Sequence, residues 1–155
     1  MQLEYNNEIV LIIPYYETTE MVRRVLAGEN KNNNQGSTID VRKYEKEGSL
    51  MIIDSLKAYF RSDTDLTSFI GRISKQAQNS GKSGVSVISD LASFYYYNQV
   101  DKLIDYEMSL PSTYDDEMKL KGFCFYHQKD FDKRFSKEQK QKLLEHHGKH
   151  LMVVN

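Results

Sequence analysis

The stretch that decides the fold is Ile9-Val10-Leu11-Ile12-Ile13, a run of five apolar residues near the start of the chain. Four of these residues are β-branched, and β-branched side chains favour strands. The run does not alternate between apolar and polar residues, which predicts a strand that is buried on both faces. Such a strand is typical of the centre of a parallel sheet that helices cover on both sides.

Four further apolar runs predict strands that extend this sheet. They are Leu50-Met51-Ile52-Ile53, Val85-Ser86-Val87-Ile88, Phe123-Cys124-Phe125-Tyr126 and Leu151-Met152-Val153-Val154. Helical patterns lie between consecutive runs, so strand and helix alternate along the chain. This alternation predicts an α/β fold of three layers, αβα, with a mostly parallel central sheet of about five strands.

Capping residues predict where several helices begin. Thr18 or Thr19 begins the first helix, because a hydroxyl oxygen can accept a hydrogen bond from a free N–H group of the first turn. Ser136 and Gln139 have the spacing of a capping box at the start of the last helix. The apolar pattern from Phe94 to Glu107 predicts one helix after the third strand.

Length, charge and cysteine content limit the class of protein. The chain of 155 residues fits a single domain over residues 1–155. Its formal net charge is −1, so no general basic field favours direct binding to nucleic acid. The single cysteine, Cys124, excludes an intrachain disulfide and suits a reducing compartment. No apolar run approaches the ~20 residues of a membrane span, so we expect a cytoplasmic protein without a membrane partner.

The carboxyl ends of parallel strands meet at one edge of a sheet, where ligands of open α/β folds bind. The predicted edge comprises residues 14–17, 54–56, 89–91 and 126–128. Tyr15-Tyr16 and Tyr95-Tyr96-Tyr97 fall close to this edge. Tyrosine combines a flat apolar ring with a polar hydroxyl, which suits a binding face for a small molecule or a partner protein.

Several patterns resemble catalytic or ligand-binding motifs but lack necessary parts. Ser80-Gly81-Lys82-Ser83 is similar to the end of a phosphate-binding P-loop, but Gln76 stands where that motif has its first glycine. This segment also follows a helix and precedes a strand, so we expect a turn. Cys124 lies within an apolar strand and is expected to be a buried small side chain. The four histidines have no set of cysteines beside them, so we expect no bound metal. We also expect no cofactor and no catalytic residue.

Asp54 offers an alternative interpretation, because it follows the second predicted strand. Response-regulator receiver domains carry a phospho-accepting aspartate at such a position. Phosphoryl transfer there requires Mg²⁺ and further carboxylates after the first strand, where this chain has Pro14-Tyr15-Tyr16 and then Glu17. A receiver-like or pseudo-receiver domain is therefore the alternative, and a capping aspartate is the simplest explanation. A third hypothesis is a small enzyme that uses Asp90 and His127 as a pair.

Five short segments, in this order and spacing, resemble one known family. They are Glu8-Ile9-Val10-Leu11-Ile12-Ile13; Gly48-Ser49-Leu50-Met51-Ile52-Ile53-Asp54 with Tyr59; Val87-Ile88-Ser89-Asp90; Ile104-Asp105-Tyr106-Glu107; and Phe123-Cys124-Phe125-Tyr126 followed by Phe131, Leu143-Leu144 and His147. The family is the MEDS sensory domain of methanogen and methylotroph signalling proteins, a degenerate relative of the RecA/KaiC-type fold that lacks a P-loop. The chain departs from the family pattern at Asp90-Leu91, where a glutamate and a methionine are usual, and residues 1–7 do not resemble the family's first strand and its Gly-Glu helix.

The resemblance implies a non-catalytic sensory or interaction domain of a prokaryotic signal-transduction system. It implies a signalling partner such as a histidine kinase or a transcription regulator, and it leaves a homodimer open. The polar positions that match the family, together with Tyr16 from the predicted edge, are the candidate ligand-binding residues. They are Tyr16, Asp54, Asp90, Glu107, Tyr126 and His147.

Overall fold

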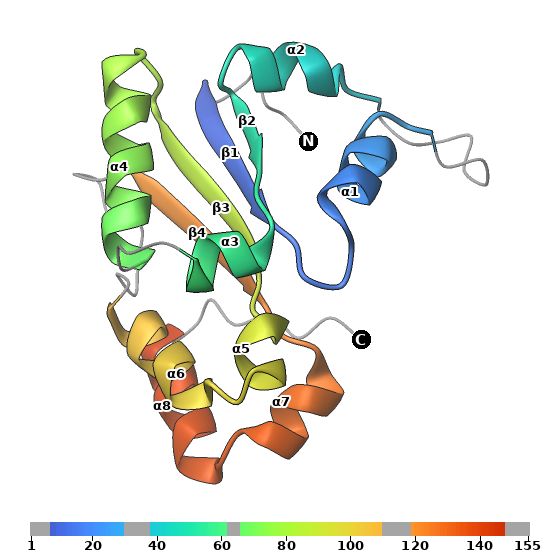
Figure 1. Cartoon of the computed structure of the whole chain (residues 1–155). Helices are drawn as coiled ribbons and strands as arrows, with labels where there is room; N and C mark the ends of the chain where they lie inside the picture. The colour runs from blue at the N-terminus through green and yellow to red at the C-terminus, as the bar shows by residue number, and fades with distance from the viewer. Residues whose placement is uncertain (1–6, 30–37, 62–65, 110–118, 148–155) are drawn as a thin grey trace.

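The computed structural model describes residues 7–29, 38–61, 66–109 and 119–147. In these residues, helices flank a four-stranded sheet whose neighbouring strands are all parallel (Figure 1). The strands are β1 (Glu8–Ile13), β2 (Leu50–Ile52), β3 (Gly84–Asp90) and β4 (Leu120–Phe125), in the order β2-β1-β3-β4. The α/β class and the parallel sheet are confirmed. The expected fifth strand, 151–154, lies outside the described residues.

The strand β1 lies inside the sheet, between β2 and β3, and both of its faces are buried as its apolar run predicted. Leu11 is completely buried on one face, and Val10 is 7% exposed on the other. Two apolar cores therefore exist, one on each side of the sheet. This arrangement follows from burying consecutive apolar side chains that point in opposite directions.

Helices cover both faces of the sheet. On one face, α1 (Thr19–Leu26) and α2 (Val41–Lys46) contribute to the smaller core around Val10, Leu50 and Ile52. The opposite face carries the larger core, to which α3 (Ser55–Phe60), α4 (Leu66–Asn79), α5 (Ala92–Tyr96), α6 (Val100–Ser109), α7 (Gln128–Arg134) and α8 (Lys137–His147) contribute. Figure 1 shows α5, α6, α7 and α8 gathered beyond the carboxyl ends of β3 and β4.

Two of the predicted helix starts are confirmed in atomic detail. The side-chain oxygen of Thr18 accepts a hydrogen bond of 3.1 Å from the backbone N–H of Met21. Ser136 and Gln139 form the reciprocal capping box: the N–H of Gln139 donates to Ser136 Oγ at 3.1 Å, and the N–H of Ser136 donates to Gln139 Oε1 at 2.8 Å. These local bonds fix where α1 and α8 begin.

Other elements differ from the sequence prediction. The single helix expected from Phe94 to Glu107 is two helices, α5 and α6, with Asn98 between them at a φ of 56°. Asparagine tolerates this left-handed conformation, which a helix cannot accommodate. The helices α3 and α7 were not expected. The last helix, α8, buries Leu143, whereas its neighbour Leu144 is 40% exposed.

The strand order reverses between β1 and β3. The connection from β1 to β2 passes through α1 and α2, which pack on the face with the smaller core. The connection from β3 to β4 passes through α5 and α6, which contribute to the larger core on the other face. The carboxyl ends of β1 and β3 therefore flank a topological switch point, the usual position of a ligand crevice in open α/β sheets.

Candidate binding site at the switch point

Three tyrosine rings gather at the switch point. Tyr15 and Tyr16 follow β1, and Tyr96 ends α5, which follows β3. The ring centroids of Tyr15 and Tyr96 are 5.5 Å apart in a stacked arrangement, and Tyr16 meets these two rings edge-on at 5.4 and 6.1 Å. Tyr16 is 50% exposed and Tyr96 is 49% exposed. These three residues, the tyrosine cluster, form an aromatic surface that solvent can reach.

A carboxylate, Asp90 at the end of β3, lies beside this aromatic surface. Its Oδ1 accepts a hydrogen bond of 2.9 Å from the backbone N–H of Ala92. Burial raises the pKa of the Asp90 carboxyl, and the backbone N–H groups of Ala92, Tyr16 and Tyr15 partly offset this by favouring the charged form. The amide groups that follow β1 are thus already directed towards an anion that belongs to the protein.

The helix α7 supplies the other wall of the site. Tyr16 donates its hydroxyl to Asp130 Oδ2 at 3.1 Å, and His127 Nδ1 lies 3.6 Å from the same oxygen. The guanidinium of Arg134 lies 5.4 Å from the ring centroid of Tyr96, within cation–π range. Burial, reinforced by hydrogen bonding, raises the pKa of Tyr16, so its phenol stays a neutral donor.

A second polar group lies in the interior, around Glu107 of α6. Glu107 is 0% exposed. Tyr126 donates its hydroxyl to Glu107 Oε1 at 2.5 Å, and His147 Nε2 lies 3.2 Å from Oε2. The contact between His147 Nε2 and Glu107 Oε2 lacks the alignment of a regular hydrogen bond, but the carboxylate still raises the pKa of His147. Cys124 is also close, and burial raises the pKa of its thiol well above the usual value.

The six candidate residues therefore divide into three places. Tyr16 and Asp90 belong to the switch-point site. Glu107, Tyr126 and His147 come together, but in the interior rather than at the exposed edge.

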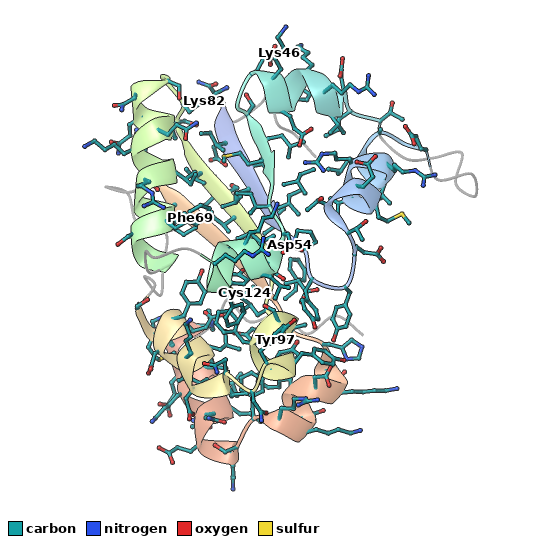
Figure 2. All side chains as sticks on the ribbon, viewed as in Figure 1. Lys46, Asp54, Phe69, Lys82, Tyr97 and Cys124 are labelled. Carbon is teal, nitrogen blue, oxygen red and sulfur yellow. The ribbon has the colours of Figure 1, made fainter. Side chains whose placement is uncertain are left out.

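Asp54 serves neither group: its Oδ1 accepts from the backbone N–H groups of Leu56 at 3.0 Å and Lys57 at 3.3 Å, so it caps α3. Figure 2 shows Asp54 close to α3, at the same end of the sheet as Tyr97, the residue that follows α5.

Three residues of the site were missed in the sequence: Asp130 and Arg134 were not singled out, and Tyr96 was noted only as one of a run of tyrosines. The first two lie on α7, a helix of seven residues that was not expected. The spacing of His127, Asp130 and Arg134, at i, i+3 and i+7, is the signal that could have placed them on one helical face.

The segment that is similar to a P-loop lies at the opposite end of the sheet from Asp54 and Tyr97, where Figure 2 labels Lys82. It is a turn between α4 and β3, as the sequence predicted. Lys82 donates its Nζ to Ser49 Oγ at 2.8 Å and to Asn7 Oδ1 at 3.3 Å, so its charge links neighbouring segments of the protein.

A shallow hollow also lies away from the switch point, over α2 and its two flanking residues, Asp40 and Glu47. Charged side chains line it, and it shares no residue with the tyrosine cluster. In the described residues, no group of three histidine, cysteine, aspartate or glutamate side chains is placed to hold a metal ion.

Comparison with known protein families, with curated proteins and with solved structures gave no match. Among the helices of the described residues, none has both the length and the apolar character needed to cross a membrane. Function is therefore inferred from the geometry of the site and from the sequence resemblance.

Proposed function

We propose that this chain is a non-catalytic sensory domain that binds its signal molecule at the switch-point site. One observation carries the proposal: an exposed group of tyrosine rings lies beside a carboxylate at the point where open α/β sheets bind ligands. The resemblance to MEDS domains supports the same function. Both lines of support lead to recognition of a molecule rather than to its chemical conversion.

The chemistry of the site favours a neutral or cationic ligand that carries a flat ring. The amide groups after β1 are directed towards Asp90, so they already face an anion that belongs to the protein. A second carboxylate, Asp130, lies on the opposite wall, where Arg134 approaches its Oδ1 at 3.8 Å. An anionic ligand would have to displace or neutralise these carboxylates. A ring with N–H or O–H donors can stack on tyrosine and donate to them.

The biological setting follows the resemblance. We propose that the domain acts in a prokaryotic signal-transduction system, in the cytoplasm, beside a histidine kinase or a transcription regulator. Binding at the switch point would then change the surface that such a partner recognises. A partner protein that docks directly on the tyrosine cluster is the other form of the same hypothesis.

Three probes with one ring and different charges test the proposal. Amide chemical shifts of the ¹⁵N-labelled protein are recorded during titration with indole, tryptamine and indole-3-acetate, which are neutral, cationic and anionic. We expect shifts centred on Tyr16, Tyr96 and His127 with the first two probes, and weaker binding of the third. Tyr96→Leu should abolish these shifts. Tyr44→Leu, on α2 (Figure 1), is the matched control and should leave them unchanged.

Three outcomes would argue against binding of such a ligand at the switch point. Equal or tighter binding of indole-3-acetate would contradict the predicted preference against anions. If no probe shifts the tyrosine cluster but a histidine kinase or regulator fragment does, the result would favour the hypothesis that a partner protein docks on this cluster. Shifts elsewhere that Tyr96→Leu does not affect would show that the switch point is not the binding site.

A further inference from the structure

The buried carboxylate of Glu107 is held between two side chains that differ in their access to water. Tyr126 binds one oxygen, and the imidazole of His147 faces the other at 3.2 Å. Glu107 is fully buried, whereas the side chain of His147 is 25% exposed at the end of α8. Protons can therefore reach the histidine from solvent while the carboxylate remains in the interior.

Other titratable groups also face Glu107, from every element packed around it. In the described part of the chain they are Cys124 on β4, Tyr126 after β4, Tyr106 on α6 and Tyr59 on α3. Burial raises the pKa of the Cys124 thiol and of each of these phenols, so all four are neutral at neutral pH. The positive charge placed against Glu107 is that of protonated His147, whose ring also packs on His146 at 5.5 Å between centroids.

Loss of the proton from His147 would leave a buried carboxylate without a compensating charge. Removing one partner of a buried ion pair is strongly unfavourable, because the remaining charge stays in a medium of low dielectric constant. The structure can relieve this cost by letting the last turn of α8 move away and water enter. The closed arrangement of α8 therefore depends on the protonated form of His147.

The same carboxylate holds a segment of the switch-point site. Tyr126 is bonded through its hydroxyl to Glu107, and the next residue is His127, the N-terminal cap position of α7. The helix α7 carries Asp130, which accepts the hydrogen bond from Tyr16. A continuous chain of contacts thus joins the end of α8 to the tyrosine cluster.

We propose that Glu107 and His147 form a proton-operated latch, which holds the last turn of α8 closed when His147 is protonated and releases that turn, and with it the α7 wall, when it is not. Its effect on ligand binding rests on the function proposed above. The latch itself needs no ligand and is tested independently.

The direction of the pH dependence follows from the contact. Glu107 raises the pKa of His147, and burial only partly offsets this. Stabilisation by the pair is therefore complete below ~6.5, the usual pKa of histidine, and is lost as the pH rises through the raised value. The latch closes under mildly acidic conditions and opens under alkaline ones.

Hydrogen exchange of the full chain, followed residue by residue between pH 5.5 and 9, tests the latch. After correction for the intrinsic rate, the opening constant of residues 144–147 should be flat below ~6.5. It should then rise by up to about tenfold per pH unit until His147 is deprotonated, because one proton is linked to opening. Glu107→Gln should abolish this slope, and the matched control His146→Gln should retain it.

If Glu107→Gln folds poorly, a second measurement on the unmodified chain replaces it. NMR of the ring protons of His147, recorded as a function of pH, gives the pKa of this histidine. In the unmodified chain, the pKa of His147 should exceed that of a free histidine. A normal or lowered value would overturn the latch. An opening constant that shows no pH slope, or a slope that is unchanged in Glu107→Gln, would overturn it as well.

The indole titration separates failure of the latch from failure of the proposed function. If the latch and the binding site are both correct, we expect indole to bind more weakly above the pKa of His147. Glu107→Gln should show no such change with pH. An exchange slope without indole binding at any pH supports the latch and counts against the binding site. Indole binding that is independent of pH, with no exchange slope, supports the site and overturns the latch.

Discussion

Tyr16 and Asp130 are 114 positions apart in the sequence and are joined by a hydrogen bond of 3.1 Å from the phenol to the carboxylate. The bond ties the loop after β1 to α7, and so it joins the two walls of the switch-point site. Each wall has its own local support: Ala92 donates to Asp90 on one side, and His127 and Arg134 approach Asp130 on the other. The Tyr16 hydroxyl is one link between them, and Arg134 adds another by donating to the backbone carbonyl of Tyr95 at 3.2 Å.

Tyr16→Phe removes this link and keeps the ring. We expect the free energy of unfolding to fall by about 0.5–1.5 kcal/mol, the usual net value of one intramolecular hydrogen bond. Urea denaturation measures the change. Tyr97→Phe is the control, because Tyr97 is similarly exposed, at 52%, and contacts the ring of Phe60 instead of Asp130. Equal losses in both variants would mean that the bond to Asp130 contributes nothing specific.

Glu107→Ala should be one of the most harmful substitutions in the chain. It leaves the Tyr126 hydroxyl and the His147 imidazole without their common partner, and we expect a loss of about 3–5 kcal/mol, as for other broken buried pairs. Denaturation near pH 6 measures it. Glu45→Ala is the comparison, because Glu45 binds Arg23 at 2.9 Å but both side chains are partly exposed. Its loss should stay at or below about 1 kcal/mol.

The pH dependence of the Glu107 contribution has a definite sign. Because the contact raises the pKa of His147, the stabilising effect of the pair is full below ~6.5 and declines at higher pH. The difference in unfolding free energy between the unmodified chain and His147→Gln should therefore shrink as the pH rises to 9. A difference that grows over this range would contradict the assignment of His147 as the protonated partner.

Two phenylalanines of β4 should tolerate polar substitution. Phe123 and Phe125 are 51% and 56% exposed, and they project from the same face of the strand. We expect Phe123→Ser and Phe125→Ser to change the unfolding free energy by no more than about 0.5 kcal/mol, whereas Phe94→Ala, at a buried position, should cost about 3–5 kcal/mol. Losses above 1 kcal/mol at the exposed positions would show that another segment or a second copy covers them.

The receiver-like alternative has a direct test at Asp54. Its Oδ1 is engaged by two backbone N–H groups at the start of α3, so we expect no phosphorylated product with acetyl phosphate and Mg²⁺. Intact-mass measurement checks this, with Asp54→Asn as the control because asparagine also caps helices well. A stable gain of one phosphoryl group that Asp54→Asn abolishes would establish the alternative.

The parts of the fold that depend on local signals were predictable, and the parts that depend on long-range contacts were not. The apolar run of β1 identified a strand buried on both faces, and the spacing of Ser136 and Gln139 located the start of α8. The break at Asn98 was missed because the apolar pattern continues across it and only its backbone conformation differs.

The same distinction applies to the site. The tyrosines after β1 were predictable because the carboxyl edge of a parallel sheet follows from the order of the elements. Asp130 and Arg134 were not, because nothing local predicts that α7 packs against a loop over a hundred positions earlier. The resemblance did select Glu107, Tyr126 and His147, which lie together, but residue type alone could not show that they face the interior.

The contact between Tyr16 and Asp130 also constrains the order of events during synthesis. The ribosome adds about 5–20 residues per second, so α7 emerges more than a hundred residues after Tyr15 and Tyr16. Until α7 emerges, Tyr16 has no Asp130 beside it, and its ring is open to any apolar surface nearby. A nascent chain therefore cannot present the finished site before α7 has emerged, so recognition at this site would distinguish chains that include α7 from chains interrupted before it.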